Sequence, residues 1–228
     1  MEQVGPILML VHKNKKMKKL TEDKVQHIFR KSDPHDIETF TETFNRYSES
    51  FGFETDFHVN AFLAQLEEEQ GIDLKPKREN LNYSCKALKA LFGYYKKHPK
   101  EATEDGRCNG HKANQKNIAN KAYGGRIGNK NPNDGWTFRG AGYIQLTGRD
   151  NYEQISNTLT LVLNHPITPE DLAIDMETVE GSLLSAMGFF LTHKLYKAKT
   201  IDEMTALVNK HTKSYKQRKK HYKYIASL

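Results

Sequence analysis

Residues 139–152 read RGAGYIQLTGRDNY, a stretch that places Gln145 and Thr147 between glycine-bearing turns. Three glycines within ten residues cost backbone entropy, so this segment is predicted to be a shaped loop or a short hairpin rather than a continuing helix. Loops held by a rigid scaffold often carry function. We therefore expect these residues to form part of a functional site.

Helical periodicity lies on both sides of this stretch. Apolar residues recur at steps of three and four over residues 37–51, 59–66, 88–95 and 179–190, which predicts amphipathic helices. Gly52 and Gly71 are expected to end the first two helices, and Ser84 is expected to cap the third, whose buried stripe would include Leu91. Residues 201–210 and the basic C-terminal run are also expected to be helical.

Between about residue 99 and residue 142 the glycines, prolines and asparagines become dense, which predicts an irregular lobe. The expected architecture is a mainly helical domain with a loop-rich lobe in its middle. A cleft between those two parts would suit an extended ligand. Residues 1–18, which end in HKNKKMKK, are expected to be a flexible N-terminal arm, and residues 19–228 a single domain.

The chain carries a formal net charge of +7, which favours attraction to polyanions such as nucleic acid, teichoic acid, lipopolysaccharide or anionic peptidoglycan. Charge alone does not choose among them. The apolar stretch ILMLV near the N-terminus is too short to span a bilayer, and it lacks the small-residue cleavage site of a signal peptide. We expect a protein without a transmembrane segment, made in the cytoplasm and delivered by another factor if its target lies outside.

Cys85 and Cys108 are the two cysteines of the chain, and either a reduced pair or a single disulfide fits the sequence. A zinc site built on Cys108 and His111 would lack two further ligands at useful spacing. We therefore expect no zinc site at these two residues.

Two acidic positions stand out as candidates for chemistry. Glu67, Glu68 and Glu69 end the second predicted helix, where the ordinary reading is a solvated charge run. With about 100° per residue, Glu68 points away from the apolar stripe, whereas Glu67 and Glu69 flank it, Glu69 slightly nearer. A carboxyl group at the edge of a core loses water, which favours its protonated form and suits a general acid.

Glu79 lies in KRENLNYS, between two basic residues and an asparagine-rich turn. It is either an exposed loop carboxylate or one held ionised by Lys77 or Arg78, ready to accept a proton from water. One protonated and one ionised carboxyl group are what an enzyme needs to hydrolyse a glycosidic bond.

Four blocks of the sequence resemble the family 19 glycoside hydrolases, especially their phage and prophage endolysins: FLAQ (62–65), ENLNYS (79–84), IANKAYGGRIGN (118–129) and DGWTFRGAGYIQLTGRDNY (134–152). The similarity covers roughly residues 20–227. It implies a lysozyme-like, mainly helical α+β fold with a central glycan-binding cleft. It also implies that residues 19–228 are one catalytic domain, which we expect to be a monomer, acting on peptidoglycan with chitin as the alternative substrate.

The resemblance implies a role for each matching residue. Glu69 occupies the place of the general acid, Glu79 that of the second carboxylate, and Thr147 that of the residue that holds the attacking water. Gln145 would face the sugar, and Arg139 would either contact the sugar or form a salt bridge with one of the glutamates. The resemblance also implies single displacement with inversion, which requires the two carboxyl groups to be about 6.5 to 9.5 Å apart and needs no metal and no cofactor.

Further substrate contacts are expected from Trp136, Tyr143 and Asn209. The two aromatic residues flank the glycine loop, where they would either stack on sugar rings or serve as buried anchors. Asn209 is the part of the family's Asn-Gly-Gly motif that carries over to this chain. Tyr123 is expected to belong to the core.

The sequence departs from the family where the acid lies, because residues 68–72 read EEQGI in place of His-Glu-Ser-Gly-Gly, and Ala141 replaces an arginine. A catalytically impaired cell-wall-binding module is therefore an alternative. A nucleic-acid-binding protein is a weaker rival, because the basic residues are not interleaved with a known binding fold, and no specific nucleic acid is expected. The terminal run KHTKSYKQRKKHYKY (210–224) is either a solvated basic helix or a docking surface for an anionic envelope.

Overall fold

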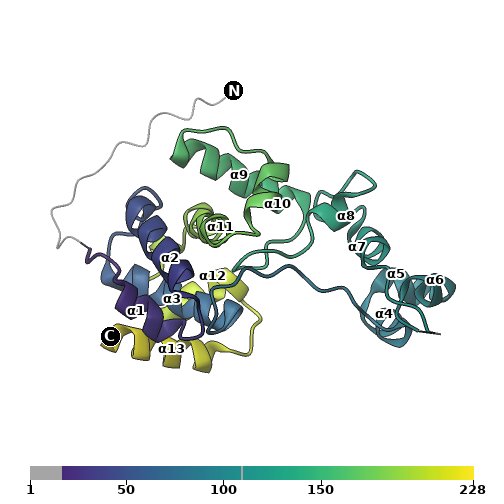
Figure 1. The fold of residues 1–228 in the computed structure, drawn as a ribbon, viewed down its shortest axis with the longest axis horizontal. Helices are drawn as coiled ribbons and strands as arrows, with labels where there is room; N and C mark the ends of the chain where they lie inside the picture. Colours follow the sequence, from purple (N-terminus) through teal and green to yellow (C-terminus); the bar gives the residue numbers. More distant parts are fainter. Residues whose placement is uncertain (1–16, 109) are drawn as a thin grey trace.

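The computed structural model describes residues 17–108 and 110–228, and it is mainly helical, as predicted (Figure 1). The predicted arm at residues 1–18 falls almost entirely outside the described residues. Figure 1 shows two groups of helices joined by extended segments, and each group has its own hydrophobic core. The expectation that residues 19–228 form one catalytic domain stays a prediction.

The larger lobe holds both ends of the described chain. Its helices are α1 (Glu22–Ile28), α2 (Pro34–Tyr47), α3 (Asp56–Gln70), α9 (Arg149–Leu163), α10 (Pro169–Asp175), α11 (Val179–Thr192), α12 (Ile201–Asn209) and α13 (Tyr215–Ser227), with a short 3-10 helix at Leu195–Lys197. The smaller lobe contains α4 (Cys85–Leu91), α5 (Gly93–Lys97), α6 (Pro99–Asp105), α7 (Gln115–Tyr123) and α8 (Asp134–Thr137).

Helices α3 and α11 form the centre of the larger lobe. Phe62 of α3 and Phe190 of α11 lie with their ring centroids 5.8 Å apart, and Phe53 stacks on Phe190 at 4.0 Å. Helix α13 packs along α3, so the last turn of α3 lies against the C-terminal helix. The predicted end of α3 at Gly71 is confirmed: this residue has a φ of 88°, which favours glycine.

The smaller lobe differs from the prediction in two respects. Residues 99–142 contain α6, α7 and α8 and are less irregular than expected, because their helices are short and are separated by the turn residues that dominate the sequence pattern. Ser84 caps α4 as predicted, but α4 ends at Leu91 because Phe92 adopts an extended conformation. Leu91 is therefore 63% exposed, and its predicted place in the buried stripe is wrong.

A disulfide joins Cys85 at the start of α4 to Cys108 after α6, with the two Cα atoms 5.9 Å apart. It closes a segment that contains α4, α5 and α6 around a small core of six fully buried apolar residues: Leu81, Leu88, Tyr95, Ala102, Ile118 and Ala119. Of the two states that the sequence left open, the structure has the bridge. Cys108 is consequently not available as a zinc ligand.

The glycine-rich stretch forms a short hairpin, as predicted. The backbones of Ala141 and Leu146 exchange two hydrogen bonds, of 3.2 and 3.0 Å, and Gln145 in the turn has a φ of 51°. Arg78 pairs with Ala141 on the other side, so the segment between α3 and α4 lies against the hairpin. These contacts place the hairpin where the two lobes join.

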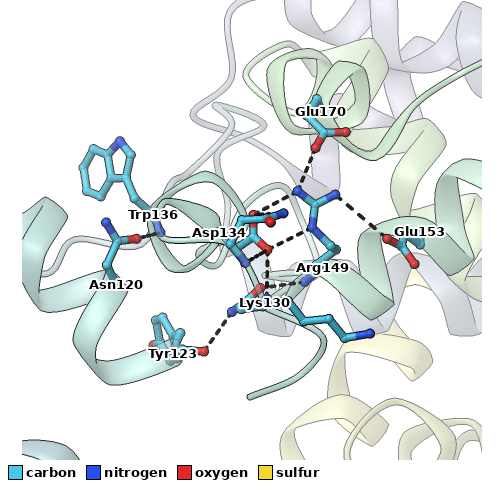
Figure 2. A network of polar contacts seen from close by, with 10 residues as sticks. Asn120, Tyr123, Lys130, Asp134, Trp136, Arg149, Glu153 and Glu170 are labelled. Carbon is cyan, nitrogen blue, oxygen red and sulfur yellow. Dashed lines mark hydrogen bonds and ion pairs between the residues drawn. The ribbon is translucent and has the colours of Figure 1, made fainter. Parts of the chain in front are cut away.

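A polar network ties the lobes together next to this hairpin (Figure 2). Arg149, the first residue of α9, donates two hydrogen bonds of 3.0 and 2.9 Å to the Asp134 carboxylate at the start of α8, and it pairs with Glu170 of α10 at 2.8 Å. Hydrogen bonds from Arg149 and from neighbouring backbone amides lower the pKa of Asp134 to about 2. Asn129 accepts from the Arg149 amide and donates to the Tyr123 carbonyl, which fixes the end of α7.

No helix within residues 17–108 and 110–228 is long and apolar enough to cross a membrane.

We predict that replacing both Cys85 and Cys108 with serine lowers the free energy of unfolding by about 3 kcal/mol, because the bridge restricts a 23-residue segment of the unfolded chain. Chemical denaturation in the absence of reductant measures this loss. Reductant should lower the stability of the wild type to that of the double variant and leave the variant unchanged. Equal stability of the oxidised wild type and the variant would contradict the prediction.

Candidate active site

Three of the predicted site residues meet around one glycine. A Cβ atom placed on Gly140 would lie 3.1 Å from Gln145 Oε1, 3.3 Å from Glu79 Cβ and 3.4 Å from Thr147 Oγ1. These distances leave little room for a side chain at position 140, so the glycine allows the side chains of Glu79, Gln145 and Thr147 to come together. The structure therefore brings Glu79, Gln145 and Thr147 into one polar cluster at the hairpin.

The Glu79 carboxylate is held by two neutral donors. Tyr123 donates its hydroxyl proton to Oε1 at 2.6 Å, and the Gly140 amide donates to Oε2 at 3.3 Å. The expected cationic partners are wrong: the Lys77 ammonium donates to the Gln70 carbonyl at 2.5 Å, and Arg78 pairs with Glu177 at 3.0 Å. The Lys77 side chain therefore anchors neighbouring backbone. The Arg78 side chain links the lobes, because it contacts Glu177 and the Thr137 carbonyl.

Tyr123 is a functional candidate that the sequence reasoning placed in the core. The structure shows it partly buried on α7, with its hydroxyl on Glu79. Burial, followed by the contact with Glu79, raises the pKa of Tyr123, so the phenol keeps its proton and acts as a donor. A tyrosine in an apolar helical pattern gives no local signal of such a partner, which is 44 residues away in the chain.

Gln145 and Thr147 present oxygen atoms to the cluster. The Gln145 amide nitrogen donates to the carbonyls of Lys77 and Gly142, at 3.2 and 3.0 Å, which leaves its Oε1 next to Gly140. The Thr147 hydroxyl donates to the Gln145 carbonyl at 2.9 Å. Because the hydroxyl proton is engaged, the lone pairs of Thr147 Oγ1 are available to accept a hydrogen bond from water.

Glu69 lies in the last turn of α3 and meets a buried arginine. Arg218 of α13 is 2% exposed and donates to Glu69 Oε1 and, at 2.6 Å, to Gln65 Oε1. The Glu69 side chain is 27% exposed, and its Oε2 has no hydrogen bond to any residue that the structure describes. The expected position at the edge of the core is correct, but a guanidinium accompanies the carboxyl group there.

Glu69 and Glu79 border the same hairpin from different sides. Glu69 and Ile144 line one small cavity of about 10 Å³, and Ile144 precedes Gln145 in the hairpin turn. Glu79 contacts the hairpin at Gly140. The predicted cleft between the two carboxyl groups stays a prediction, because Glu79 does not line this cavity.

Burial decides one of the two aromatic predictions and leaves the other open. Tyr143 is 1% exposed and donates its hydroxyl proton to the Leu74 carbonyl at 2.7 Å, so it is a buried anchor and its predicted stacking on sugar is wrong. Trp136 is partly buried, and the Arg139 guanidinium covers its ring at 3.5 Å from the centroid. Only the uncovered part of this ring is available to a ligand.

Arg139 and Asn209 lie apart from the carboxylates. Arg139 donates to the Trp136 carbonyl at 2.6 Å, and the expected salt bridge to a glutamate does not form among the described residues. Burial, with the nearby Arg78, lowers the pKa of Arg139. Asn209 is exposed as the last residue of α12, so its proposed sugar contact remains a prediction.

A larger cavity of about 820 Å³ lies elsewhere, between the start of α2, residues 73–76 and residues 177–180. None of the eight predicted site residues lines it. The polar groups of Glu79, Gln145 and Thr147 do not line this cavity, so its size alone does not make it the active site. Within the described part of the chain, no group of three or more His, Cys, Asp or Glu side chains is arranged to hold a metal ion.

We predict that Tyr123→Phe lowers kcat/KM for glycan hydrolysis by roughly 10- to 100-fold, because a hydrogen bond to a charged group contributes about 1.5–3 kcal/mol. Tyr95→Phe is the matched control, since Tyr95 donates to the Asp105 carboxylate at 2.9 Å in the core of the smaller lobe. It should cost stability without a comparable loss of kcat/KM. Equal losses of kcat/KM in the two folded variants would contradict the role given to Tyr123.

Comparison with known proteins bears on the family of the chain. No family model matches it. A glycosyl hydrolase family 19 domain-containing protein of Haemophilus influenzae is 30% identical over 183 residues, which make up 79% of this chain and 84% of that protein. Because the similarity extends over most of both chains, this chain belongs to glycosyl hydrolase family 19.

Proposed function

We propose that this protein is an endolysin of the phage type, a lysozyme that hydrolyses the β-1,4-glycosidic bonds of bacterial peptidoglycan with inversion. The observation that carries the proposal is the convergence of Glu79, Gln145 and Thr147 on Gly140. A carboxylate beside a hydroxyl with free lone pairs is the arrangement that a water nucleophile requires.

Glu79 is the proposed general base. It removes a proton from a water molecule held by Thr147 Oγ1, and the water oxygen forms a bond to the anomeric carbon. Tyr123 and the Gly140 amide keep the carboxylate oriented while the proton is transferred. Gln145 Oε1 is placed to accept a hydrogen bond from the sugar.

Glu69 is the proposed general acid. With the proton on Oε2, its Oε1 can still accept the hydrogen bond from Arg218. The bond between the anomeric carbon and the leaving oxygen breaks as Oε2 gives up its proton to that oxygen. Arg218 then stabilises the carboxylate that is produced, which favours the transition state.

Peptidoglycan is preferred to chitin as the substrate because the chain has a net charge of +7 and chitin is uncharged. Chitin stays the second candidate, since both polymers contain N-acetylglucosamine and one site can accept either. The Cys85–Cys108 disulfide supports action outside the reducing cytoplasm, after delivery by another factor. We propose that the protein acts as a monomer.

We predict that Glu69→Gln and Glu79→Gln each lower kcat by about 10²- to 10⁴-fold, the usual contribution of a general acid or base. Release of reducing ends from purified peptidoglycan and from chitin oligomers measures the loss and ranks the two substrates. Glu42→Gln, at an exposed position of α2, is the matched control and should keep full activity. Full activity of either folded catalytic variant would remove that glutamate from the mechanism.

The altered residues 68–72 make a catalytically impaired wall-binding module the second candidate function. The assay of reducing-end release distinguishes this binding module from an active hydrolase. A wild-type protein that binds peptidoglycan and releases no reducing ends from either polymer is a binding module.

Helix α13 supports a further part of the proposal, docking on an anionic envelope. One face of α13 is buried against the protein through Arg218 and Ile225. Lys216, Lys220 and Lys223 are exposed and recur at steps of four and three, so they share the outer face. The exposed lysines fit both alternatives that the sequence left open for the basic run, a solvated basic helix and a docking surface, and we propose the second.

We predict that replacing Lys216, Lys220 and Lys223 with glutamine weakens sedimentation with anionic cell walls and reduces its dependence on salt, while hydrolysis of short chitin oligomers is unchanged. The control replaces Lys96, Lys97 and Lys100, three exposed lysines of the smaller lobe. It removes the same charge from another surface. Equal weakening by the two triple variants would show that net charge, rather than the α13 face, attracts the protein to walls.

A further inference from the structure

The last turn of α3 carries three consecutive glutamates, and one turn of α13 supplies a partner for each. Arg218 meets Glu69, while His221 lies between Glu67 and Glu68. Arg218 and His221 are three residues apart, so they lie on the same face of α13. The residue proposed to donate the catalytic proton is therefore flanked by two further carboxylates that depend on a single imidazole.

Both ring nitrogens of His221 face carboxylate oxygens. Nδ1 lies 2.7 Å from Glu67 Oε2, and Nε2 lies 3.2 Å from Glu68 Oε2. A neutral imidazole carries one N–H, so it would direct a lone pair at one of these carboxylates. The imidazolium form has a proton for each of them, and this geometry fits that form.

Because Glu67 is buried, its carboxylate depends on the proton of His221 for a cationic partner. Glu67 is 7% exposed, and apart from the ion pair its Oε2 has no hydrogen-bond partner in the described part of the chain. His221 is 17% exposed and Glu68 is 22% exposed. Loss of the proton would leave a buried carboxylate without a cation, which opposes close packing of the two helices.

The other groups near the ring do not replace this pairing. On α13 itself, the Gln217 amide lies 3.2 Å from His221 Nε2, and the amide oxygen would take that place if the side chain is turned over. From α12, Asp202 faces α13 but pairs with Lys219 at 2.7 Å. The contacts with Glu67 and then Glu68 raise the pKa of His221 above its usual value.

We propose that protonated His221 is a positioning residue for Glu69, because it holds the end of α3 against α13 and so keeps Arg218 on the catalytic carboxyl group. This role rests on the proposed function of Glu69 as the general acid. His221 touches no substrate and acts through the interface of the two helices.

Because folding raises the pKa of His221, the stability that this histidine contributes depends on pH. A histidine whose pKa is higher in the folded protein contributes stability that is fully present below the unfolded value of about 6.5. That contribution is lost as the pH rises through the folded value. The contact between α3 and α13 should therefore weaken on the alkaline side.

The test compares wild type, His221→Arg and His221→Gln across pH 5.5 to 9, a range of roughly three units around the usual histidine pKa. Two quantities are measured in each protein: kcat for hydrolysis of purified peptidoglycan and of chitin oligomers, and the hydrogen exchange of α13 amides, corrected for its intrinsic pH dependence. Arginine keeps a cation at every pH, and its planar fork can reach two carboxylates. His165→Gln is the control, since His165 is exposed and lies outside α3 and α13.

Wild type is expected to lose kcat on the order of tenfold toward high pH, a common size for coupling between two linked equilibria, while α13 loses protection over the same interval. His221→Arg should keep both kcat and protection at high pH, and His221→Gln should have low values of both throughout. The control should behave as wild type.

The same pH response of kcat and exchange in wild type and His221→Arg would overturn the proposal. Hydrolysis and α13 protection are measured separately, so failure of the proposed function is distinguishable from failure of the positioning role of His221. A wild type that hydrolyses neither substrate, with a pH-dependent α13, would overturn the proposed function and with it the positioning role. Active wild type with an α13 that does not respond to pH would overturn the role of His221 alone.

Discussion

The backbone pairing between residues 77–79 and 140–142 is the constraint on which the rest of the site depends. The Glu79 amide donates to the Gly140 carbonyl at 2.7 Å, and the Gly142 amide donates to the Lys77 carbonyl at 3.0 Å. These two bonds join the segment after α3 to the hairpin before α9. They place the backbone of Glu79 beside the hairpin that carries Gln145 and Thr147.

The lobes contribute different parts of the site, and separate networks hold each part. Tyr123 reaches Glu79 from α7, and α7 is tied through Asn129 to Arg149 on the larger lobe (Figure 2). Glu69 is held separately, by Arg218 on the last helix of the chain. Different parts of the protein therefore hold the two carboxyl groups. A change in either part would alter the distance between the carboxyl groups without changing the hairpin.

The sequence was sufficient for features that depend on local patterns. Apolar periodicity predicted α3, the glycine at position 71 predicted its end, and the glycine density of residues 139–152 predicted the hairpin. Long-range partners could not be predicted in this way. Tyr123 is 44 residues from Glu79, and Arg218 is 149 residues from Glu69. Pairings over such separations produce no periodic pattern in the sequence. Tyr143 was ambiguous for another reason, because a buried anchor and a sugar platform require the same aromatic side chain.

A crystal structure with an N-acetylglucosamine oligomer bound across the hairpin tests the central claim most directly. The account predicts that the carboxyl groups of Glu69 and Glu79 lie on opposite sides of one glycosidic bond, about 6.5 to 9.5 Å apart, as an inverting hydrolase requires. A water molecule should lie between Glu79 and the anomeric carbon, within reach of Thr147. An oligomer bound away from the hairpin, or carboxyl groups that open onto separate surfaces, would contradict the account.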